Sequence, residues 1–190
     1  MTTTYIGLFR HGQTDWNIDF RLQGTSDIPM NETGLEQVKT ATRALASDWE
    51  VAITSPLGRA VQTAQIATEY LGLETAQVEP LLLERSFGDA EGMLYEDWRE
   101  LLAQAAVPGC ESIADLETRC HRLLEKLVLE HEGKRVLAVS HGALIRKVLN
   151  LVSKNEFPRE GERLGNASLS VIAFDGSHWR IEDYRPHTRV

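Results

Sequence analysis

The chain alternates short, nearly continuous apolar runs with longer segments in which apolar residues recur every three or four positions. This alternation is typical of an α/β domain, in which helices cover a sheet, and the continuous runs predict strands that are buried on both faces. Strands are predicted at residues 5–9, 51–54, 136–139, 169–174 and 179–184.

Helices are predicted between these strands from apolar spacing and from capping residues. Thr33 and Glu36 have capping-box spacing and predict a helix that extends to Ser47. A second helix is predicted to begin at Ser55, a hydroxyl cap followed by a proline, and to end at Leu71 before a glycine. The remaining predicted helices cover residues 95–106, 112–130 and 143–151.

Residues 88–111 interrupt the alternation and predict a short helical insertion beside the sheet, in position to cover a site. Pro108 and Gly109 break the predicted helix within it. No internal repeat, low-complexity tract or linker divides the chain. The 190 residues therefore predict one domain.

Charge and composition exclude several classes of protein. With 20 basic and 28 acidic residues the formal charge is 20 − 28 = −8, which argues against a nonspecific grip on nucleic acid or on an anionic membrane. No apolar stretch is long enough to span a membrane, and residues 1–10 lack a signal-peptide pattern, so we expect a cytoplasmic protein. Cys110 and Cys120 fit neither a disulfide framework nor a zinc site, and we expect two free thiols.

Two strands end in a His-Gly pair, which is the most informative local pattern. His11-Gly12 follows one apolar strand and His141-Gly142 follows another. Open α/β sheets bind ligands at the carboxyl ends of their strands, so both imidazoles are expected at one crevice. The N–H groups of the helix after Gly142 are expected to face the same crevice and favour an anion. On this pair alone, two ordinary turn histidines remain the alternative.

Further polar residues converge on the same edge. Arg10 precedes His11, and Arg59 lies in the first turn of a helix that follows a third strand. Two guanidiniums aimed at one crevice are suited to clamp a phosphoryl group. Asn17 and Gln23-Gly24, in the loop after the first strand, are candidates for neutral donors or for ordinary turn residues.

Glu84 is the candidate acid. It follows an apolar run, so we expect partial burial, which favours the neutral form of a carboxyl group. A neutral carboxylic acid beside a transferring phosphoryl group donates its proton to the leaving oxygen. A salt bridge to Arg10 or Arg59 is an equally open alternative.

These residues allow phosphoryl transfer without a metal. A neutral imidazole attacks phosphorus to form a covalent phosphoenzyme, and His11 is the better candidate. Arg10, Arg59 and, when protonated, His141 stabilise the charge on the equatorial oxygens. The sequence has no H-E-x-x-H, no phosphate-binding P-loop and no G-x-G-x-x-G motif, so neither a metal nor a cofactor is expected.

Several short motifs follow one another in a fixed order along the chain. They are Arg10-His11-Gly12, Thr14 and Asn17, Gln23-Gly24, Ser55-Pro56-Leu57 with Arg59 and Thr63-Ala64, Glu84 with Phe87-Gly88 and Glu91-Gly92, and Ser140-His141-Gly142. With these motifs the chain resembles the histidine phosphatase superfamily, also called phosphoglycerate mutase-like, over nearly its whole length.

The resemblance implies a three-layer α/β/α sandwich around a mostly parallel mixed sheet. It also implies a phosphohistidine at His11 and Glu84 as proton donor. The implied phosphate pocket consists of Arg10, Asn17, Arg59 and His141.

The branch of the family is decided by the cations of the insertion. Phosphoglycerate mutases carry a longer insertion with a lysine and an arginine pair, whereas Tyr95 stands near the lysine's place here and residues 88–112 contain one basic residue, Arg99. Without such cations, retention of a bisphosphorylated intermediate is physically implausible. The resemblance favours a phosphatase acting on a small phosphorylated metabolite; a mutase and a noncatalytic phospho-ligand domain are the alternatives.

The aromatic residues near the insertion, the tail and the last predicted strand each allow two interpretations. Aromatic residues near the insertion either line a leaving-group pocket or pack, with packing the commoner case. They are Trp16, Phe20, Tyr95 and Trp98. Residues 185–190 contact substrate or fray, and the predicted strand at Trp179 allows edge pairing in a homodimer.

Overall fold

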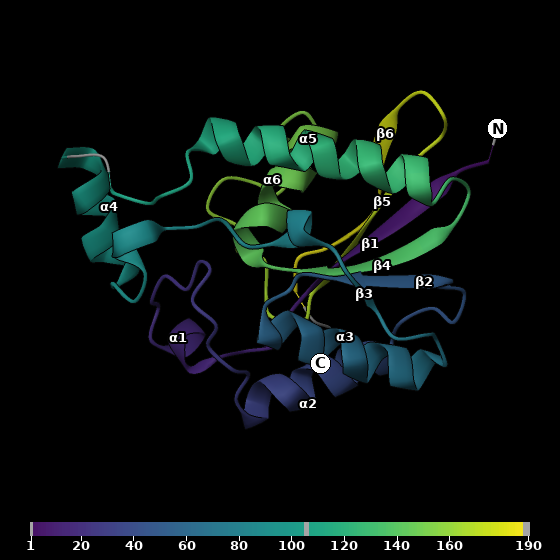
Figure 1. The fold of residues 1–190 in the computed structure, drawn as a ribbon, viewed down its shortest axis with the longest axis horizontal. Coiled ribbons are helices and arrows are strands. Elements are labelled where there is room, and N and C mark those ends of the chain that lie inside the picture. Colours follow the sequence, from purple (N-terminus) through teal and green to yellow (C-terminus); the bar gives the residue numbers. More distant parts are fainter. Residues whose placement is uncertain (1, 105–106, 188–190) are drawn as a thin grey trace.

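The computed structural model describes residues 2–104 and 107–187 and contains a six-stranded mixed sheet (Figure 1). Its strands, in the order β3-β2-β4-β1-β5-β6, are parallel from β3 to β1, whereas β5 and β6 are antiparallel to their neighbours. The bounds are β1 Thr4–Arg10, β2 Val51–Thr54, β3 Gln77–Val78, β4 Arg135–Ser140, β5 Leu169–Phe174 and β6 Trp179–Arg185.

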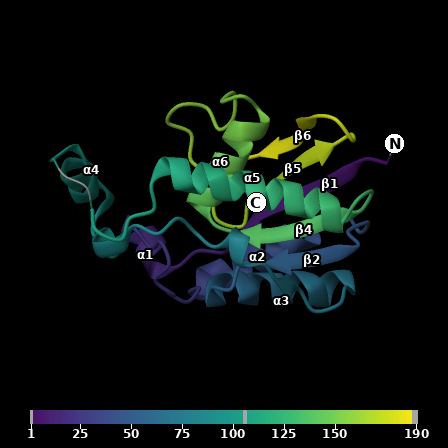
Figure 2. The same ribbon diagram turned by 45° about the horizontal axis from the view of Figure 1, so that its top comes forward.

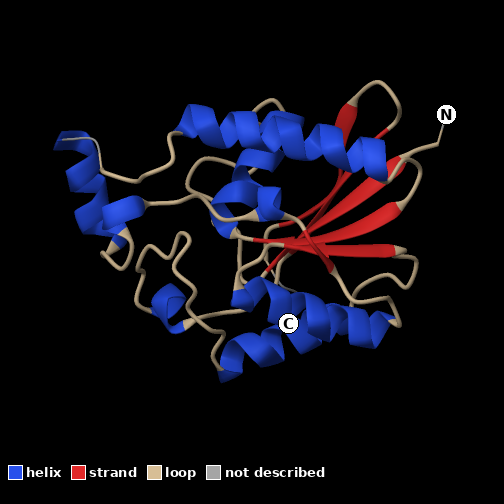
Figure 3. Ribbon diagram, viewed as in Figure 1, coloured by secondary structure: helices blue, strands red, loops and turns tan. Residues whose placement is uncertain are grey.

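Helices cover both faces of the sheet and complete the predicted three layers (Figures 1 and 3). The helices α2 (Glu32–Arg43) and α3 (Gly58–Leu71) lie on one side, and α5 (Ile113–Glu130) and α6 (Gly142–Val152) lie on the other. Because side chains alternate along a strand, β1 and β4 supply apolar residues to a separate core on each face. The α/β sandwich that the sequence predicts is confirmed.

The register of the parallel strands determines where the polar residues emerge. Arg10 at the end of β1 is aligned with Ser140 at the end of β4, and Thr54 of β2 is aligned with Val139 of β4. His11 and His141 therefore follow adjacent strands directly, at the same edge of the sheet.

The predicted start of the first helix is wrong. α2 begins at Glu32, and Asn31 is its cap, with a side-chain oxygen that accepts a hydrogen bond from Gly34 N at 2.8 Å. The helix also ends at Arg43 rather than at Ser47. A capping box occurs instead in α1 (Asp15–Ile18), a single turn that is too short for apolar periodicity to reveal.

The predicted cap of α3 is also wrong. The helix begins at Gly58, and Leu57 at the cap position makes no side-chain hydrogen bond. The carboxylate of Asp27 accepts the hydrogen bond from Gly58 N, at 2.9 Å to each oxygen. Because Asp27 is distant in sequence, no local pattern reveals this cap.

The insertion lies beside the sheet (Figures 1 and 2), and its side chains form a small satellite core together with Leu22. Its predicted helix is present as α4 (Tyr95–Gln104), while residues 105 and 106 lie outside the described part of the chain. Trp98 is buried and meets Phe87 edge-on at 5.4 Å between ring centroids, so it packs rather than faces a ligand. The 3-10 turns Pro80–Leu82 and Gly88–Ala90 precede α4.

Two simple observations concern the cysteines and the lengths of the helices. Cys110 and Cys120 are free thiols, as predicted, and burial raises the pKa of Cys120 to about 12. Within the described residues, none of the helices is both long and apolar enough to cross a bilayer.

Asp27→Ala is expected to destabilise the protein by about 0.5–2 kcal/mol, because it removes the N-terminal cap of α3. Urea unfolding measures this change. Asp48→Ala is the matched control, since Asp48 is likewise half exposed and paired with an arginine but caps no helix. Equal losses of stability in the two variants would contradict the capping role.

Candidate active site

Two buried histidines lie side by side where β1 and β4 end. The ring centroids of His11 and His141 are 5.2 Å apart, and the rings are tilted by 55°. His11 and His141 are 2% and 0% exposed, so each can change protonation only at the cost of placing a charge in the interior. The structure brings together the two imidazoles that the sequence singles out.

The hydrogen bonds of His11 leave one ring nitrogen free to react. Nδ1 of His11 lies 2.7 Å from the carbonyl oxygen of Gly12, which only accepts, so Nδ1 carries the proton. In the neutral ring Nε2 then holds the lone pair. The backbone is held as well, because Ser140 O accepts from His11 N at 3.1 Å. Nε2 is therefore the ring nitrogen of His11 that is able to act as a nucleophile.

His141 is oriented by a residue that the sequence analysis did not place in the site. Its Nε2 lies 2.7 Å from the hydroxyl oxygen of Ser55, the residue predicted to cap α3. Its Nδ1 is buried and has no hydrogen-bond partner among the described residues. A buried polar atom without a partner is costly, which makes His141 Nδ1 a contact point for a ligand.

Burial lowers the pKa of both histidines well below 6.5. For His11 the nearby guanidiniums of Arg10 and Arg59 lower the pKa further, and for His141 the neighbouring His11 adds to the effect. Both rings are therefore neutral at pH 7 in the unliganded protein. His11 fits a nucleophile in this state, whereas the positive charge expected on His141 requires an anionic ligand beside it.

Arg59 is almost fully buried and holds the neighbouring loop. Its guanidinium donates to the carbonyl oxygens of Ser26 at 2.7 Å and Gly24 at 2.8 Å, while its Nε has no partner among the described residues. Burial lowers the pKa of Arg59, although Glu84 and Asp27 oppose the shift. Arg59 thus combines a buried positive charge with a buried Nε donor that has no partner among the described residues.

Arg10 lies beside the start of α6. It donates to the carbonyl oxygen of Leu164, and its buried Nε has no partner among the described residues. Burial lowers its pKa to about 10, so it stays charged at neutral pH. A Cβ added to Gly142 would lie 3.3 Å from the Arg10 guanidinium carbon, so the glycine allows this close approach.

Glycine occupies position 12, directly after His11, for a different reason. A Cβ at Gly12 would lie 2.4 Å from the carbonyl oxygen of Gly34, so this glycine lets the loop pack on α2. Neither Gly12 nor Gly142 has a left-handed backbone, so close packing rather than a turn explains both glycines.

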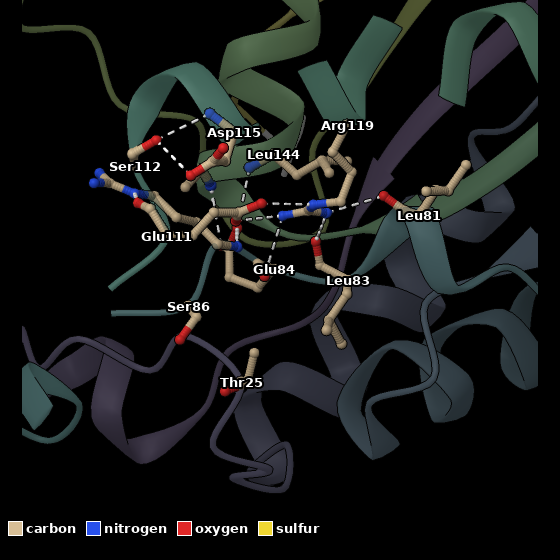
Figure 4. A network of polar contacts seen from close by, with 12 residues as sticks. Thr25, Leu81, Leu83, Glu84, Ser86, Glu111, Ser112, Asp115, Arg119 and Leu144 are labelled. Atoms are coloured by element: carbon tan, nitrogen blue, oxygen red, sulfur yellow. Dashed lines mark hydrogen bonds and ion pairs between the residues drawn. The ribbon is translucent and has the colours of Figure 1, made fainter. Parts of the chain in front are cut away.

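Glu84 occupies the N-terminus of α6 (Figure 4). Its Oε1 accepts from Arg85 N at 2.8 Å and Leu144 N at 3.0 Å, and its Oε2 accepts from Ala143 N at 3.0 Å. These α6 N–H groups therefore bind Glu84 and not the ligand predicted for them. Glu84 is buried, and its carboxyl group makes three hydrogen bonds with backbone N–H groups. One acceptor position remains on Oε2.

No ion pair joins Glu84 to Arg10 or Arg59 among the described residues. Instead, Arg119 of α5 holds the segment before Glu84 (Figure 4). It donates to Leu83 O at 2.6 Å and Leu81 O at 3.0 Å, and it forms a two-point ion pair with Glu111 at 2.6 and 2.8 Å. This network fixes the backbone that carries Glu84, and no sequence motif pointed to it.

The loop after β1 brings the remaining predicted residues to the same place. The side-chain oxygen of Asn17 accepts from Thr14 N at 3.0 Å and from Asn166 at 3.0 Å, and Asn166 also donates to His11 O at 3.2 Å. Gln23 is buried, and its Oε1 has no partner among the described residues.

Glu91 closes this loop against the insertion, a role that sequence reasoning missed. It accepts from Thr25 N at 2.9 Å and Ser26 N at 2.8 Å. Gly24 has a φ of +53°, and a Cβ there would lie 2.1 Å from Glu91 Oε1, so only glycine fits. The insertion is thereby joined directly to the loop that Arg59 holds.

The unpartnered nitrogen atoms and the positive charges at the crevice define the kind of ligand that it suits. Buried nitrogen atoms without partners belong to Arg10, Arg59 and His141. Together with the two buried guanidinium charges they suit a compact anion with several oxygens, such as a phosphoryl group. Within the described residues, no three His, Cys, Asp or Glu side chains gather as a metal-binding group.

The fold and this site define a histidine phosphatase. A family model of the histidine phosphatase superfamily (branch 1) matches residues 6–186, and the chain belongs to that family.

Similar proteins include both phosphatases and mutases by name. The Bacillus subtilis (strain 168) protein named uncharacterized phosphatase PhoE is 39% identical over 188 residues, which cover 98% of this chain and 97% of that one. A probable phosphoglycerate mutase, GpmB of Serratia proteamaculans (strain 568), is 36% identical over 190 residues, covering 92% and 86%. The structure of mycobacterial glucosyl-3-phosphoglycerate phosphatase with VO3 superposes with a TM-score of 0.82 at 28% identity, covering 95% and 98%.

His11 and His141 are expected to stay neutral from pH 8 to pH 6, because the pKa of each lies well below 6.5. Imidazole signals in a nuclear magnetic resonance titration of the unliganded protein measure this, with added N-acetylhistidine amide as the unperturbed reference. Half-titration of either ring at pH 6.5 or above would contradict the electrostatic description of the site.

Proposed function

We propose that the enzyme hydrolyses phosphomonoesters of small metabolites through a phosphohistidine at His11, without a metal ion. The observation that carries the proposal is the neutral ring of His11, whose Nδ1 is held by the Gly12 carbonyl and whose Nε2 is free, beside unpartnered nitrogen atoms of Arg10, Arg59 and His141. An uncharged nitrogen next to fixed positive charge is the arrangement that attack on an anionic phosphoryl group requires.

In the first step, the Nε2 lone pair of His11 attacks phosphorus. A nitrogen–phosphorus bond forms, and the ester phosphorus–oxygen bond breaks with its electron pair on the leaving oxygen. Glu84 supplies a proton to that oxygen from Oε2, where an acceptor position remains. The arriving phosphoryl dianion favours the protonated form of Glu84, because two like charges repel each other.

In the second step, water attacks the phosphohistidine. Glu84, now a carboxylate, accepts a proton from the water, the nitrogen–phosphorus bond breaks, and Nε2 regains its lone pair. Arg10 and Arg59 stabilise charge on the phosphoryl oxygens in both steps, and His141 joins them once the anion raises its affinity for a proton. Inorganic phosphate and the starting enzyme result.

Mutase activity is the second candidate, and the relative named GpmB favours it. A mutase must retain a doubly phosphorylated intermediate, for which the insertion offers a single basic residue, Arg99. Phosphatase activity needs no such retention. A noncatalytic binding role is disfavoured because the nucleophile, the acid and the cations are all present.

The cellular location, the oligomeric state and the partners of the protein remain predictions. The free thiols of Cys110 and Cys120 support a cytoplasmic location, where thiols stay reduced. The strand β6 lies at an edge of the sheet, which supports pairing in a homodimer, while the net charge of −8 supports neither nucleic acid nor an anionic membrane as partner.

His11→Ala is expected to reduce phosphate release from phosphomonoesters by about 10³-fold or more, since it removes the nucleophile. The assay omits metal and bisphosphoglycerate, includes EDTA, and follows 3-phosphoglycerate and its 2-isomer in parallel. His178→Ala, at an exposed turn, is the control and should retain full activity. Loss of activity in EDTA that added metal restores would overturn the metal-free reaction, and isomer exchange with little free phosphate would indicate a mutase.

Glu84→Gln is expected to slow hydrolysis of alkyl phosphates by about 10²- to 10⁴-fold but that of 4-nitrophenyl phosphate far less, because nitrophenolate leaves without a proton. Steady-state rates on both substrates measure the difference, and urea unfolding checks that the variant is folded. Equal losses on the two substrates would remove Glu84 from the acid role.

A further inference from the structure

Phe20 has an unusual backbone for a bulky residue. It follows α1 with a φ of +54°, in the left-handed region that favours glycine, and its side chain is 60% exposed. The backbone of Phe20 is thus strained, although its apolar ring is not buried. Strain of this kind is concentrated at sites of function.

Arg163 lies against this exposed ring. Its guanidinium carbon is 5.2 Å from the centroid of Phe20, in a cation–π contact. The side chain is exposed and forms no hydrogen bond or ion pair with any residue of the described ranges. Stacking uses the face of the guanidinium, so its in-plane N–H donors remain available to a planar acceptor.

Both residues directly adjoin the phosphate-binding residues. Leu164, the neighbour of Arg163, accepts a hydrogen bond from Arg10 through its carbonyl oxygen. Phe20 N donates to the carbonyl oxygen of Asn17 at 3.4 Å. The two loops are joined again where Asn166 donates to Asn17. The Phe20 and Arg163 pair therefore connects the two loops that flank His11.

The acidic side chains nearest in sequence to Arg163 and Phe20 already have partners. Asp19 is 3.8 Å from Arg21, and Glu162 accepts from Tyr184 at 2.6 Å and from Arg159 N at 3.0 Å. Arg163 therefore carries an uncompensated positive charge on a protein of net charge −8. A charge in this position attracts an anion on the part of the substrate that projects from the phosphate site.

We propose that Phe20 and Arg163 form a leaving-group subsite that binds a carboxylate. This inference rests on the proposed phosphatase function and narrows it to phosphomonoesters whose leaving group carries a carboxylate. Phe20 orients the guanidinium, and Arg163 pairs with both carboxylate oxygens through its fork of N–H donors. Arg163 is thus a specificity-determining residue outside the phosphoryl-transfer machinery.

A matched pair of substrates tests the subsite. 3-Phosphoglycerate and racemic glycerol 1-phosphate share a carbon skeleton and differ in a carboxylate against a hydroxymethyl group. The unmodified enzyme is expected to prefer 3-phosphoglycerate. Arg163→Gln is expected to lower the ratio of the two kcat/KM values at least tenfold, through a higher KM for 3-phosphoglycerate, with the KM for glycerol 1-phosphate and inhibition by inorganic phosphate unchanged.

Arg159→Gln is the matched control. Arg159 is also exposed, lies in the same segment, and stacks on an aromatic ring, that of Phe157, at 5.8 Å. The variant Arg159→Gln should leave the ratio of the two kcat/KM values unchanged. Phe20→Leu, which keeps an apolar side chain but removes the ring face, should lower the ratio by a smaller factor than Arg163→Gln.

The dependence of KM on ionic strength distinguishes direct binding by Arg163 from a purely structural role of this residue. Raising the ionic strength should increase the KM for 3-phosphoglycerate more in the unmodified enzyme than in Arg163→Gln, because an exposed charge pair is screened.

The subsite is overturned if the unmodified enzyme hydrolyses both substrates without preferring 3-phosphoglycerate. It is also overturned if Arg163→Gln leaves the ratio unchanged, or if Arg159→Gln lowers it equally. Failure of the proposed function is a separate outcome, namely no hydrolysis of either substrate or of 4-nitrophenyl phosphate by the unmodified enzyme, and it overturns the subsite as well.

Discussion

The site depends on the parallel pairing of β1 with β4. Their register aligns Arg10 with Ser140, so the next residue on each strand is a histidine and the two imidazoles meet although 130 positions separate them (141 − 11). Burial at this edge then keeps both rings neutral beside buried guanidiniums. A shift of one residue in the register would move His11, which follows β1, out of alignment with His141, which follows β4.

The buried positive charges are held mainly by backbone carbonyl groups, and the half-exposed carboxylate of Asp27 lies 3.9 Å from Arg59. Arg59 donates to two carbonyl oxygens and Arg10 to one, while Glu84 accepts from three backbone N–H groups. The charges therefore do not neutralise one another through direct contacts. A preorganised site of this kind keeps its electrostatic attraction for the ligand, because carbonyl groups hold the guanidiniums in place without cancelling their charge.

The sequence predicts the layers and the converging residues because both follow from local patterns. Apolar runs predict the strands, and a His-Gly pair after two of them predicts the site. The parts that could not be predicted depend on contacts between distant residues: Asp27 caps α3, Ser55 orients His141, and Arg119 supports the segment before Glu84. Ser55 shows why a local signal misleads, since its hydroxyl suits a helix cap equally well.

Trapping the phosphohistidine tests the central claim most directly. The unmodified enzyme is mixed with a phosphomonoester, quenched with base within milliseconds, and digested for mass spectrometry under conditions that preserve phosphohistidine. The account predicts a phosphoryl group on the peptide that contains His11, with none on the peptide that contains His141 and none in His11→Ala. Hydrolysis at full rate without any phosphorylated His11 peptide, or with the phosphoryl group on another residue, would contradict it.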